Sequence, residues 1–458
     1  MPPQDLDAER AVLGGVFQSN AVLHNLVDTI VPEDFYSPAH REIYAAFLAL
    51  YNKNHPMDYV TVADELTRMG KLDEVGGPVY LAELGESVVS AANAARHAHI
   101  VRDRAILRHL IDTASSIISR CYDSGEVEEL LDSAEQDIFA ITDARQTSPI
   151  VSSKDLINQV VDEVEARFLR KSQITGIETR YAEFDKMTAG LQKSDLIIVA
   201  GRPSMGKTAF ALNLALNAAT NRANATPTAV FSLEMSKEQL MTRLLSTRSR
   251  VPLQHIRTGY LSDDEWPLIH DGADALMQAP LFIDDTPALS TLELRARCRR
   301  LKSQHDIGLV IVDYLQLMRS SRNPDSREQE ISDISRSLKA LAKELAVPVI
   351  ALSQLNRRVE DRNPPKPMLS DLRESGAIEQ DADVIVFLYR DSYYKRLKMR
   401  KSGEEAQDEA AFVDNTATLI IGKQRNGPVG DVDLIFVEKY ASFENKIDAP
   451  DPSEVYGS

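Results

Sequence analysis

A glycine-rich segment carries the strongest chemical signal in the sequence. Residues 201–208 read GRPSMGKT and match the spacing G-x-x-x-x-G-K-[ST] at every defined position. The glycines let the backbone turn its amide groups toward phosphates, and the start of a following helix adds a positive dipole end. In such a loop the lysine, here Lys207, reaches the β- and γ-phosphates, and the hydroxyl of Thr208 binds Mg²⁺. The motif predicts a site for ATP and Mg²⁺ built from Gly201, Arg202, Pro203, Ser204, Met205, Gly206, Lys207 and Thr208.

The acidic partner of the metal ion has two candidates. LVIVDYLQL places Asp313 after a longer apolar run, whereas LFIDD places Asp284 and Asp285 after a shorter one. Either pattern is typical of a carboxylate at the end of a strand. The pattern favours Asp313, because its strand is longer and better formed, and leaves Asp284 open.

Two further polar side chains follow apolar runs and could act during hydrolysis. Glu234, in VFSLEM, could orient the attacking water as a catalytic base. Gln354 ends PVIALSQ, where a neutral amide could sense the γ-phosphate. Ligands of parallel sheets lie at the carboxyl ends of strands, which is where both residues fall. Without the glycine-rich loop, each would be more simply explained as a structural residue.

Basic residues near the C-terminus suggest two other contacts. Lys423 and Arg425 lie in IIGKQRNGPVG, just past an apolar run, and could reach a nucleotide bound by a neighbouring subunit. The alternative is a solvated turn with ordinary basic residues. In SDLRESGAIEQDADVI, residues 370–385, Arg373 could contact a DNA phosphate. An exposed loop with internal ion pairs is the alternative there.

The elements that must position these residues follow from the pattern of apolar segments. From Asp195 onward, short β-branched runs alternate with helical stretches, which indicates an α/β domain with a mostly parallel sheet covered on both faces. The glycine-rich segment falls between the first run and a helix, as its chemistry requires. The runs span residues 195–200, 228–235, 281–285, 307–318, 348–354, 383–389 and 416–422.

The first third of the chain predicts an all-α domain without a catalytic motif. Apolar residues recur there at three- and four-residue spacings. We divide the chain into a helical interaction domain (1–145), a linker with an amphipathic helix (146–175) and an ATPase domain (176–458). The helix after the linker QTSPIVS could pack its apolar stripe on its own domain or on a neighbouring subunit. That stripe consists of Ile157, Val160, Val161, Val164 and Phe168.

Composition narrows the class of protein without deciding its activity. The net charge is −17, but residues 1–150 hold 11 Lys and Arg against 24 Asp and Glu, so most of the acidity lies there. Overall acidity lowers the expectation of DNA binding and leaves room for a local basic channel. The absence of a long apolar run or a secretory signal, and two isolated cysteines expected to be reduced core residues, favour a cytoplasmic protein without a membrane span.

Taken together, the motifs resemble the DnaB family of bacterial replicative DNA helicases. The resemblance rests on segments that occur in the same order and cover nearly the whole chain. It includes DAERAVLGG near the N-terminus and TAGLQKSDLIIVA before the glycine-rich loop. The other segments are GRPSMGKTAFALNLA, FSLEMS, LVIVDYLQLM, ALSQLNR, DLRESGAIEQDADVI and GKQRNGPVG.

This resemblance implies a RecA-like motor domain, a helical N-terminal domain and a linker helix that docks on the adjacent subunit. Family members form homohexamers around single-stranded DNA and move 5′ to 3′ using ATP. A primase, a helicase loader and the replicative polymerase assembly are the implied partners. By resemblance, Asp313 rather than Asp284 is the metal carboxylate. The other roles implied are Glu234 as catalytic glutamate, Gln354 as sensor, Lys423 and Arg425 as the pair acting on the neighbouring nucleotide, and Arg373, Glu374 and Gly376 as DNA contacts.

Two departures and two rival functions remain at this stage. Arg180 and Tyr181 stand where the family commonly has a glycine and an aromatic residue, and the charged segment 395–410 is longer than usual. We expect neither to change the chemistry of the nucleotide site. The rivals are a RecA-like recombinase that forms open filaments and a P-loop scaffold whose main task is protein binding.

Overall fold

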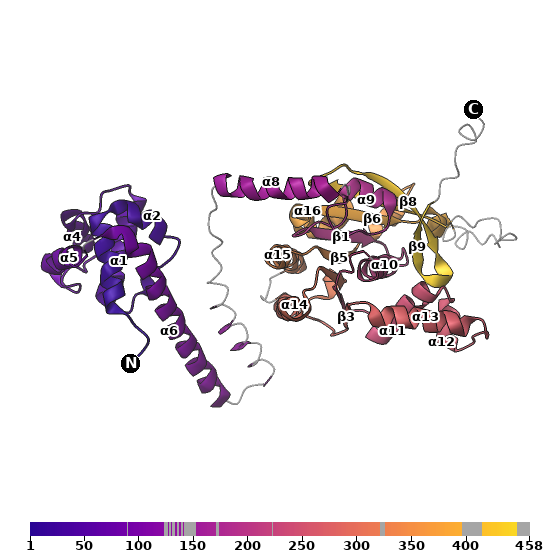
Figure 1. The fold of residues 1–458 in the computed structure, drawn as a ribbon, viewed down its shortest axis with the longest axis horizontal. Helices are drawn as coiled ribbons and strands as arrows, with labels where there is room; N and C mark the ends of the chain where they lie inside the picture. The colour runs from indigo at the N-terminus through magenta and orange to yellow at the C-terminus, as the bar shows by residue number, and fades with distance from the viewer. Residues whose placement is uncertain are drawn as a thin grey trace. The chain divides into compact units, whose positions relative to one another are not determined.

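The computed structural model describes two compact units, residues 1–157 and 158–458 (Figure 1). The described residues are 1–88, 90–122, 153–170, 174–221, 223–320, 326–395 and 415–446, with isolated residues between 127 and 141. Only the backbone is described for residues 373–375 and for part of the helix at 153–170. The expected linker 146–152, residues 396–410 of the charged segment and the C-terminal tail lie outside the described residues.

The first unit is helical, as its apolar spacing predicts. One face of each main helix enters a common core that includes Val12, Phe35, Ile43, Phe47 and Leu66. Cys121 lies exposed near the end of the last helix, so the prediction of a core position was wrong for this cysteine, because the helix continues past the core after Ala105. The main helices are α1 (Leu6–Gln18), α2 (Leu23–Leu26), α3 (Pro38–Asn52), α4 (Tyr59–Arg68), α5 (Gly77–Glu86) and α6 (Ala94–Tyr122).

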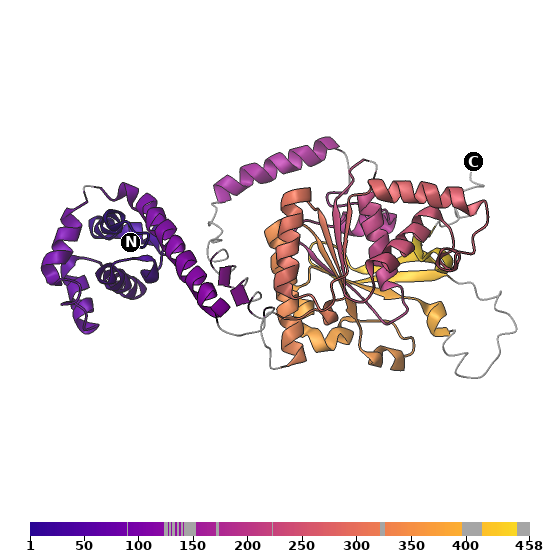
Figure 2. The ribbon, with the colours of Figure 1, turned by 90° about the horizontal axis from the view of Figure 1, so that it is seen from below.

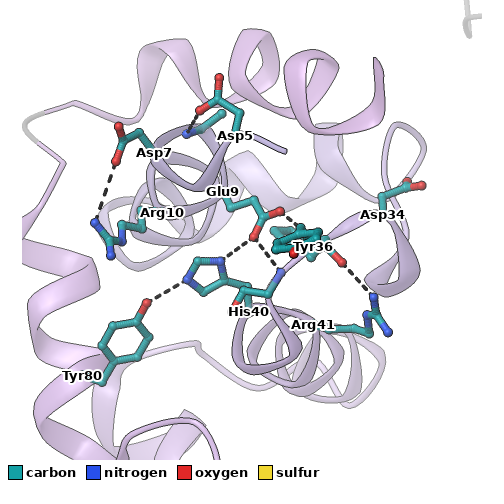
Figure 3. A network of polar contacts seen from close by, with 12 residues as sticks. Asp5, Asp7, Glu9, Arg10, Asp34, Tyr36, His40, Arg41 and Tyr80 are labelled. Carbon is teal, nitrogen blue, oxygen red and sulfur yellow. Dashed lines mark hydrogen bonds and ion pairs between the residues drawn. The ribbon is translucent and has the colours of Figure 1, made fainter. Parts of the chain in front are cut away.

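A buried polar network joins three of these helices (Figure 3). The Glu9 carboxylate of α1 accepts from the backbone amide of Tyr36 at 2.6 Å and lies 2.6 Å from Nδ1 of His40 in α3. Nε2 of His40 lies 2.8 Å from the hydroxyl of Tyr80 in α5. Glu9 is 1% exposed and His40 is 2% exposed. Because buried polar groups are costly when unpaired, these contacts tie α1, α3 and α5 into one arrangement.

The second unit is built on one sheet, which among the described residues has nine strands in the order β3-β2-β4-β5-β1-β6-β7-β8-β9. The strands from β3 to β6 are parallel, and β7, β8 and β9 continue the sheet antiparallel. The expectation of a mostly parallel sheet is confirmed. The strands are β1 (Leu196–Gly201), β2 (Thr228–Ser232), β3 (Leu281–Asp284), β4 (Leu309–Asp313), β5 (Val349–Gln354), β6 (Val384–Tyr389), β7 (Thr416–Gln424), β8 (Gly430–Val437) and β9 (Ser442–Asn445).

Helices cover both faces of this sheet (Figure 2). Alternate residues of β1 enter two cores: Ile197 packs with α10 on one face, and Ile198 packs with α15 on the other. Strands that are buried on both faces of the sheet consist of continuous apolar residues, and for this reason the sequence predicts them. The helices that follow α6 among the described residues, whether or not they cover the sheet, are α8 (Ser153–Arg170), α9 (Ala182–Thr188), α10 (Lys207–Ala219), α11 (Lys237–Ser249), α12 (Leu253–Thr258), α13 (Glu265–Gln278), α14 (Thr291–His305), α15 (Arg327–Leu345) and α16 (Gly376–Asp381).

Candidate nucleotide-binding site

The glycine-rich loop joins the end of β1 to the start of α10. Gly206 is the residue before the helix and has φ 98°, and Ser204 has φ 66°. A Cβ atom on Gly206 would lie 3.1 Å from the ring of Phe443 in β9, so both the left-handed backbone and the close packing require glycine there. The helix start at Lys207 gives the loop the free amide groups and positive dipole end that bind phosphate.

Lys207, the first residue of α10, directs its ammonium group back to the start of the loop. Its ammonium group donates to the carbonyl oxygens of Gly201 at 2.9 Å and Arg202 at 3.2 Å. Burial lowers the pKa of Lys207 to about 8, against the opposing effect of the nearby Asp313 and Glu234 carboxylates. A phosphate would offer this ammonium a charged acceptor in place of neutral carbonyls.

The two expected metal ligands meet across the end of the sheet. The Thr208 hydroxyl donates to Oδ2 of Asp313 at 2.7 Å. Burial raises the pKa of Asp313, and the bond from Thr208 works in the opposite direction. A hydroxyl and a carboxylate oxygen side by side, next to a phosphate-binding loop, fit the oxygen ligands that Mg²⁺ prefers.

The competing carboxylate lies elsewhere. Asp284 ends β3, at the edge of the sheet, where it contacts Arg297 and accepts from the Thr286 hydroxyl at 2.7 Å. These local partners account for its position as a structural residue. The second aspartate of that run, Asp285, contacts Lys237 at the start of α11.

A cavity of about 340 Å³ opens over the loop and gathers most of the predicted residues. Glu234 comes from the turn after β2, and Gln354 ends β5. The parallel strand order brings both to the carboxyl edge of the sheet. The cavity is lined by Pro203, Ser204, Gly206, Lys207, Thr208, Ala209, Glu234, Met235, Arg243, Asp313, Tyr314 and Gln354.

The side-chain amide of Gln316 positions the end of β5, where Gln354 lies. Gln316 Nε2 donates to the Ser353 hydroxyl at 2.9 Å, and the backbone amide of Gln354 donates to Gln316 Oε1 at 3.3 Å. Ser353 is fully buried. The end of β5 is therefore positioned, while the Gln354 side chain stays exposed beside the cavity.

Arg202 belongs to the loop by its backbone, but its side chain points elsewhere. It is 7% exposed, and its Nε donates to Glu360 at 2.7 Å while Nη1 donates to the Leu355 carbonyl at 2.9 Å. The guanidinium thus ties the loop to the segment after β5. Arg202 is not among the residues that line the cavity over the loop, so we expect only its backbone to face a phosphate there.

Arg243 was not predicted from the sequence. It lies on α11 and lines the cavity with Glu234 and Asp313. Burial lowers the pKa of Arg243, against the effect of those two carboxylates. The sequence held no signal for it, because α11 carries two arginines, Arg243 and Arg248, and only the packing of the helix decides which one faces the cavity.

Lys423 and Arg425 are not at this cavity. Ile385 of β6 pairs with Lys423, and β6 in turn pairs with β1 near its start at Ile197. The glycine-rich loop follows the other end of β1. At about 3.3 Å per residue, the six residues of β1 separate the two places by roughly 17 Å. This basic pair therefore lies at the amino ends of the parallel strands, whereas the loop of the same subunit lies at their carboxyl ends.

The predicted DNA loop lies between β5 and β6. It forms a short 3₁₀ segment (Leu369–Ser375) followed directly by α16. Asp371 anchors the segment by accepting from the Met368 amide at 2.8 Å and by contacting Arg362. The Arg373 and Glu374 side chains lie outside the described residues, and Gly376 is exposed.

The family departure at Arg180 lies away from the cavity over the loop. Arg180 has φ 65°, a value that favours glycine, and its guanidinium donates to the Thr220 carbonyl at 2.9 Å. It lines a separate cavity of about 690 Å³ together with Arg248 and Arg250. This second cavity shares no lining residue with the one over the glycine-rich loop in the described part of the chain.

Within the described residues, no helix combines the length and the apolar character needed to cross a bilayer.

Comparisons with known proteins agree with this architecture. The family description "DnaB-like helicase C terminal domain" matches residues 176–445, and "DnaB-like helicase N terminal domain" matches residues 1–103. The chain is 46% identical to "Replicative DNA helicase DnaC" of Bacillus subtilis over 447 residues, which cover 97% of this chain and 95% of that protein. It is also 46% identical to "Replicative DNA helicase DnaB" of Geobacillus stearothermophilus, with the same coverage.

Solved structures give the same result. One, described as "The Structure Of A DnaB-Like Replicative Helicase And Its Interactions With Primase", is 34% identical with a TM-score of 0.72 and covers 97% of this chain and 100% of that one. Another, described as an ATPase domain, is 37% identical with a TM-score of 0.59, over 65% of this chain and 100% of that one. With a helical unit, a RecA-like sheet and a phosphate-binding loop that match along nearly its full length, this chain belongs to the DnaB family of replicative DNA helicases.

Proposed function

We propose that this ATP-dependent DNA helicase works as a homohexameric ring that moves 5′ to 3′ on single-stranded DNA in the cytoplasm. In this proposal ATP and Mg²⁺ bind between adjacent subunits. The single observation that carries it is the separation of the basic pair from the loop of the same subunit: Lys423 and Arg425 lie at the far edge of the sheet from Lys207. If these cations stabilise the γ-phosphate, they must do so in another subunit.

One subunit supplies the groups that bind and orient ATP. Lys207 donates to the β- and γ-phosphates, and Thr208 and Asp313 would hold a Mg²⁺ ion, whose charge would offset the negative charge of the phosphates. Glu234 orients the attacking water and accepts its proton, and Gln354 senses the γ-phosphate. The next subunit supplies Lys423 and Arg425.

An exposed helix supports assembly into a ring. The apolar stripe of α8 is exposed: Val164 is 55% exposed and Phe168 is 82% exposed. A helix with such a stripe needs a partner to cover it. We assign that partner to the motor domain of the adjacent subunit, and we keep 1–145, 146–175 and 176–458 as the interaction domain, the linker and the motor domain.

DNA contact is assigned to Arg373, Glu374 and Gly376, which precede and begin α16. Contacts to backbone phosphates make binding largely independent of sequence and sensitive to salt. A similar helicase is described with primase, which supports a primase as a partner here. A helicase loader and the replicative polymerase assembly complete the proposed set of partners.

The test of this function is unwinding of a forked duplex with Mg·ATP. We expect unwinding that requires the 5′ tail and disappears with Lys207→Ala. Unwinding that requires only the 3′ tail would overturn the direction. Hydrolysis without strand separation on any fork would instead favour the scaffold alternative, and open filaments in electron micrographs would favour the recombinase.

Mixed oligomers test the action of Arg425 between subunits. Arg425→Ala and Lys207→Ala subunits, each inactive alone, should recover part of the hydrolysis when mixed, because an intact loop of the first kind then faces an intact Arg425 of the second. Lys446→Ala, which removes a lysine paired with Asp433 on β8, is the matched control and should keep full activity by itself. No recovery in the mixture of the two inactive variants would rule out action between subunits.

A further inference from the structure

The basic pair at the end of β7 is bonded to carbonyl oxygens of its own subunit. Lys423 donates to the carbonyl oxygens of Glu379 and, at 2.8 Å, Ala382, and its ammonium lies 3.5 Å from the carbonyl oxygen of Gln380. The three N–H donors of this ammonium therefore face backbone carbonyls of its own subunit. Arg425 adds a bond of 2.6 Å from its guanidinium to the Gln380 carbonyl.

These carbonyls lie at the end of α16, which spans Gly376–Asp381, and on Ala382 just after it. The last carbonyls of a helix have no partner inside the helix, and cations placed there stabilise it. A short helix gains little stability by itself, so an external cap has a large share in keeping it formed. The start of the same helix carries the proposed DNA contacts.

A buried carboxylate fixes the position of Arg425. Asp383 lies between α16 and β6, and its side chain is 7% exposed. It accepts from the backbone amide of Leu196 at 2.8 Å and contacts Lys339. Its other oxygen lies 3.6 Å from Nε of Arg425, and the backbone amide of Arg425 donates to the Asp383 carbonyl at 2.9 Å.

We propose that Lys423 and Arg425 have a second role as a cap on α16 of their own subunit, with Asp383 as the positioning residue, and that this cap and contact with the neighbour's γ-phosphate are alternatives. The proposal rests on the proposed function, in which the pair acts between subunits and residues 373–376 contact DNA. Because the Lys423 ammonium is bonded to carbonyls at and just after the end of α16, a phosphate that recruits this ammonium would compete with those carbonyls. ATP in one subunit would thereby loosen the end of α16 in the next.

Hydrogen exchange of residues 376–384 in the full chain, without nucleotide or DNA, tests the cap. Lys423→Met keeps the apolar stem and removes the donors, so exchange there should become roughly 3- to 10-fold faster, the range expected for loss of a helix cap. Lys446→Met is the matched control and should leave this segment unchanged. Unchanged exchange in Lys423→Met would overturn the cap.

The wild-type chain tests the alternation without any change at Lys423. A non-hydrolysable ATP analogue with Mg²⁺ should accelerate exchange of residues 376–384, and Lys207→Ala should abolish that response. No acceleration in the wild type would overturn the alternation even if the cap exists.

Single-stranded DNA affinity separates this role from the proposed action between subunits. Without nucleotide, Lys423→Met should bind an oligo-dT probe several-fold more weakly, whereas a residue that acts only on a neighbour's nucleotide would leave this affinity unchanged. If mixed oligomers show no action between subunits but exchange still accelerates, the cap stands and the proposed interface role fails. If action between subunits is found and exchange does not change, the cap alone fails.

Discussion

Single side chains at the phosphate-binding loop set the conditions under which ATP can bind. Lys207 is held by two backbone carbonyls, and the adjacent Thr208 is bonded to Asp313. This arrangement places an ammonium, a hydroxyl and a carboxylate where the proposed function expects the phosphates and Mg²⁺. The protonation state of Lys207 decides whether the cation is present.

ATP affinity should fall as pH rises through about 8. Burial lowers the pKa of Lys207 to about 8, and only the protonated amine can donate a charge-assisted bond to phosphate. Below this pH the group is charged and binding is insensitive to pH. Above it, the dissociation constant should rise by up to about tenfold per pH unit, since each proton must be regained on binding. Titration of Mg·ATP binding from pH 7 to 9.5 measures this, and a flat profile would contradict it.

Arg243 should matter for hydrolysis although it lies outside every recognisable motif. It lines the cavity with Glu234 and Asp313 and supplies positive charge beside both carboxylates. We expect Arg243→Ala to lower kcat for ATP by roughly 100-fold, the lower end of the range found when one preorganised electrostatic group is removed. Arg248→Ala, one and a half turns along α11, is the control and should leave kcat unchanged. An equal loss of kcat in both variants would contradict a specific role of Arg243 in hydrolysis.

Among the helices, α8 exposes an apolar stripe to solvent. Ile157, Val160, Val161, Val164 and Phe168 are each about half or more exposed along one stripe. An apolar stripe of this kind is stabilised only when another surface covers it. Covering this stripe should therefore stabilise the proposed oligomer rather than the single chain.

Val164→Asp should therefore weaken the oligomer. A charge in the middle of the stripe would have to be desolvated on docking, which costs several kcal/mol unless a partner compensates it. Asn158→Asp adds the same charge beside the stripe, on an exposed position of α8, and serves as the control. Light scattering after size exclusion should show smaller species for Val164→Asp only. Intact oligomers for both variants would argue against docking through this stripe.

For the whole molecule, the two units have separate cores and should respond separately to damage. Glu9→Ala would leave His40 and the Tyr36 amide without their acceptor inside the helical unit. We expect a loss of about 3 kcal/mol in the stability of that unit, as for other buried polar groups deprived of a partner. Glu74→Ala removes an exposed glutamate paired with Lys71 and should cost less than about 0.5 kcal/mol.

Hydrogen exchange in the full chain measures both effects together. Protection should fall in α1 and α3 for Glu9→Ala, whereas β1 and α10 should keep theirs, because the described core residues of the two units do not overlap. A loss of protection in β1 as large as that in α1 would mean that the two units unfold together.

The predicted runs include β1 to β7, and the strands that the prediction missed are β8 and β9, at one edge of the sheet. The parallel strands are continuous apolar runs, whereas β8 alternates buried Val432, Leu434 and Phe436 with more exposed residues. An antiparallel strand near a sheet edge needs only one apolar face, so a search for continuous runs misses it. The short strand β9 was missed for the same reason, although its Phe443 packs on Gly206 of the glycine-rich loop.

The sequence by itself determined the phosphate-binding loop, the parallel sheet and the helical first domain, because each depends on local spacing of glycines and apolar residues. Only the tertiary structure decided which distant side chains meet. It bonded Thr208 to Asp313, brought Arg243 to the cavity and directed the Arg202 side chain to Glu360. It also bonded Lys423 and Arg425, which lie at the end of β7, to carbonyls at and just after the end of α16. The reason is physical: a strand end is recognisable from local sequence, but the neighbours it meets depend on strand order, which is set by the packing of the whole domain.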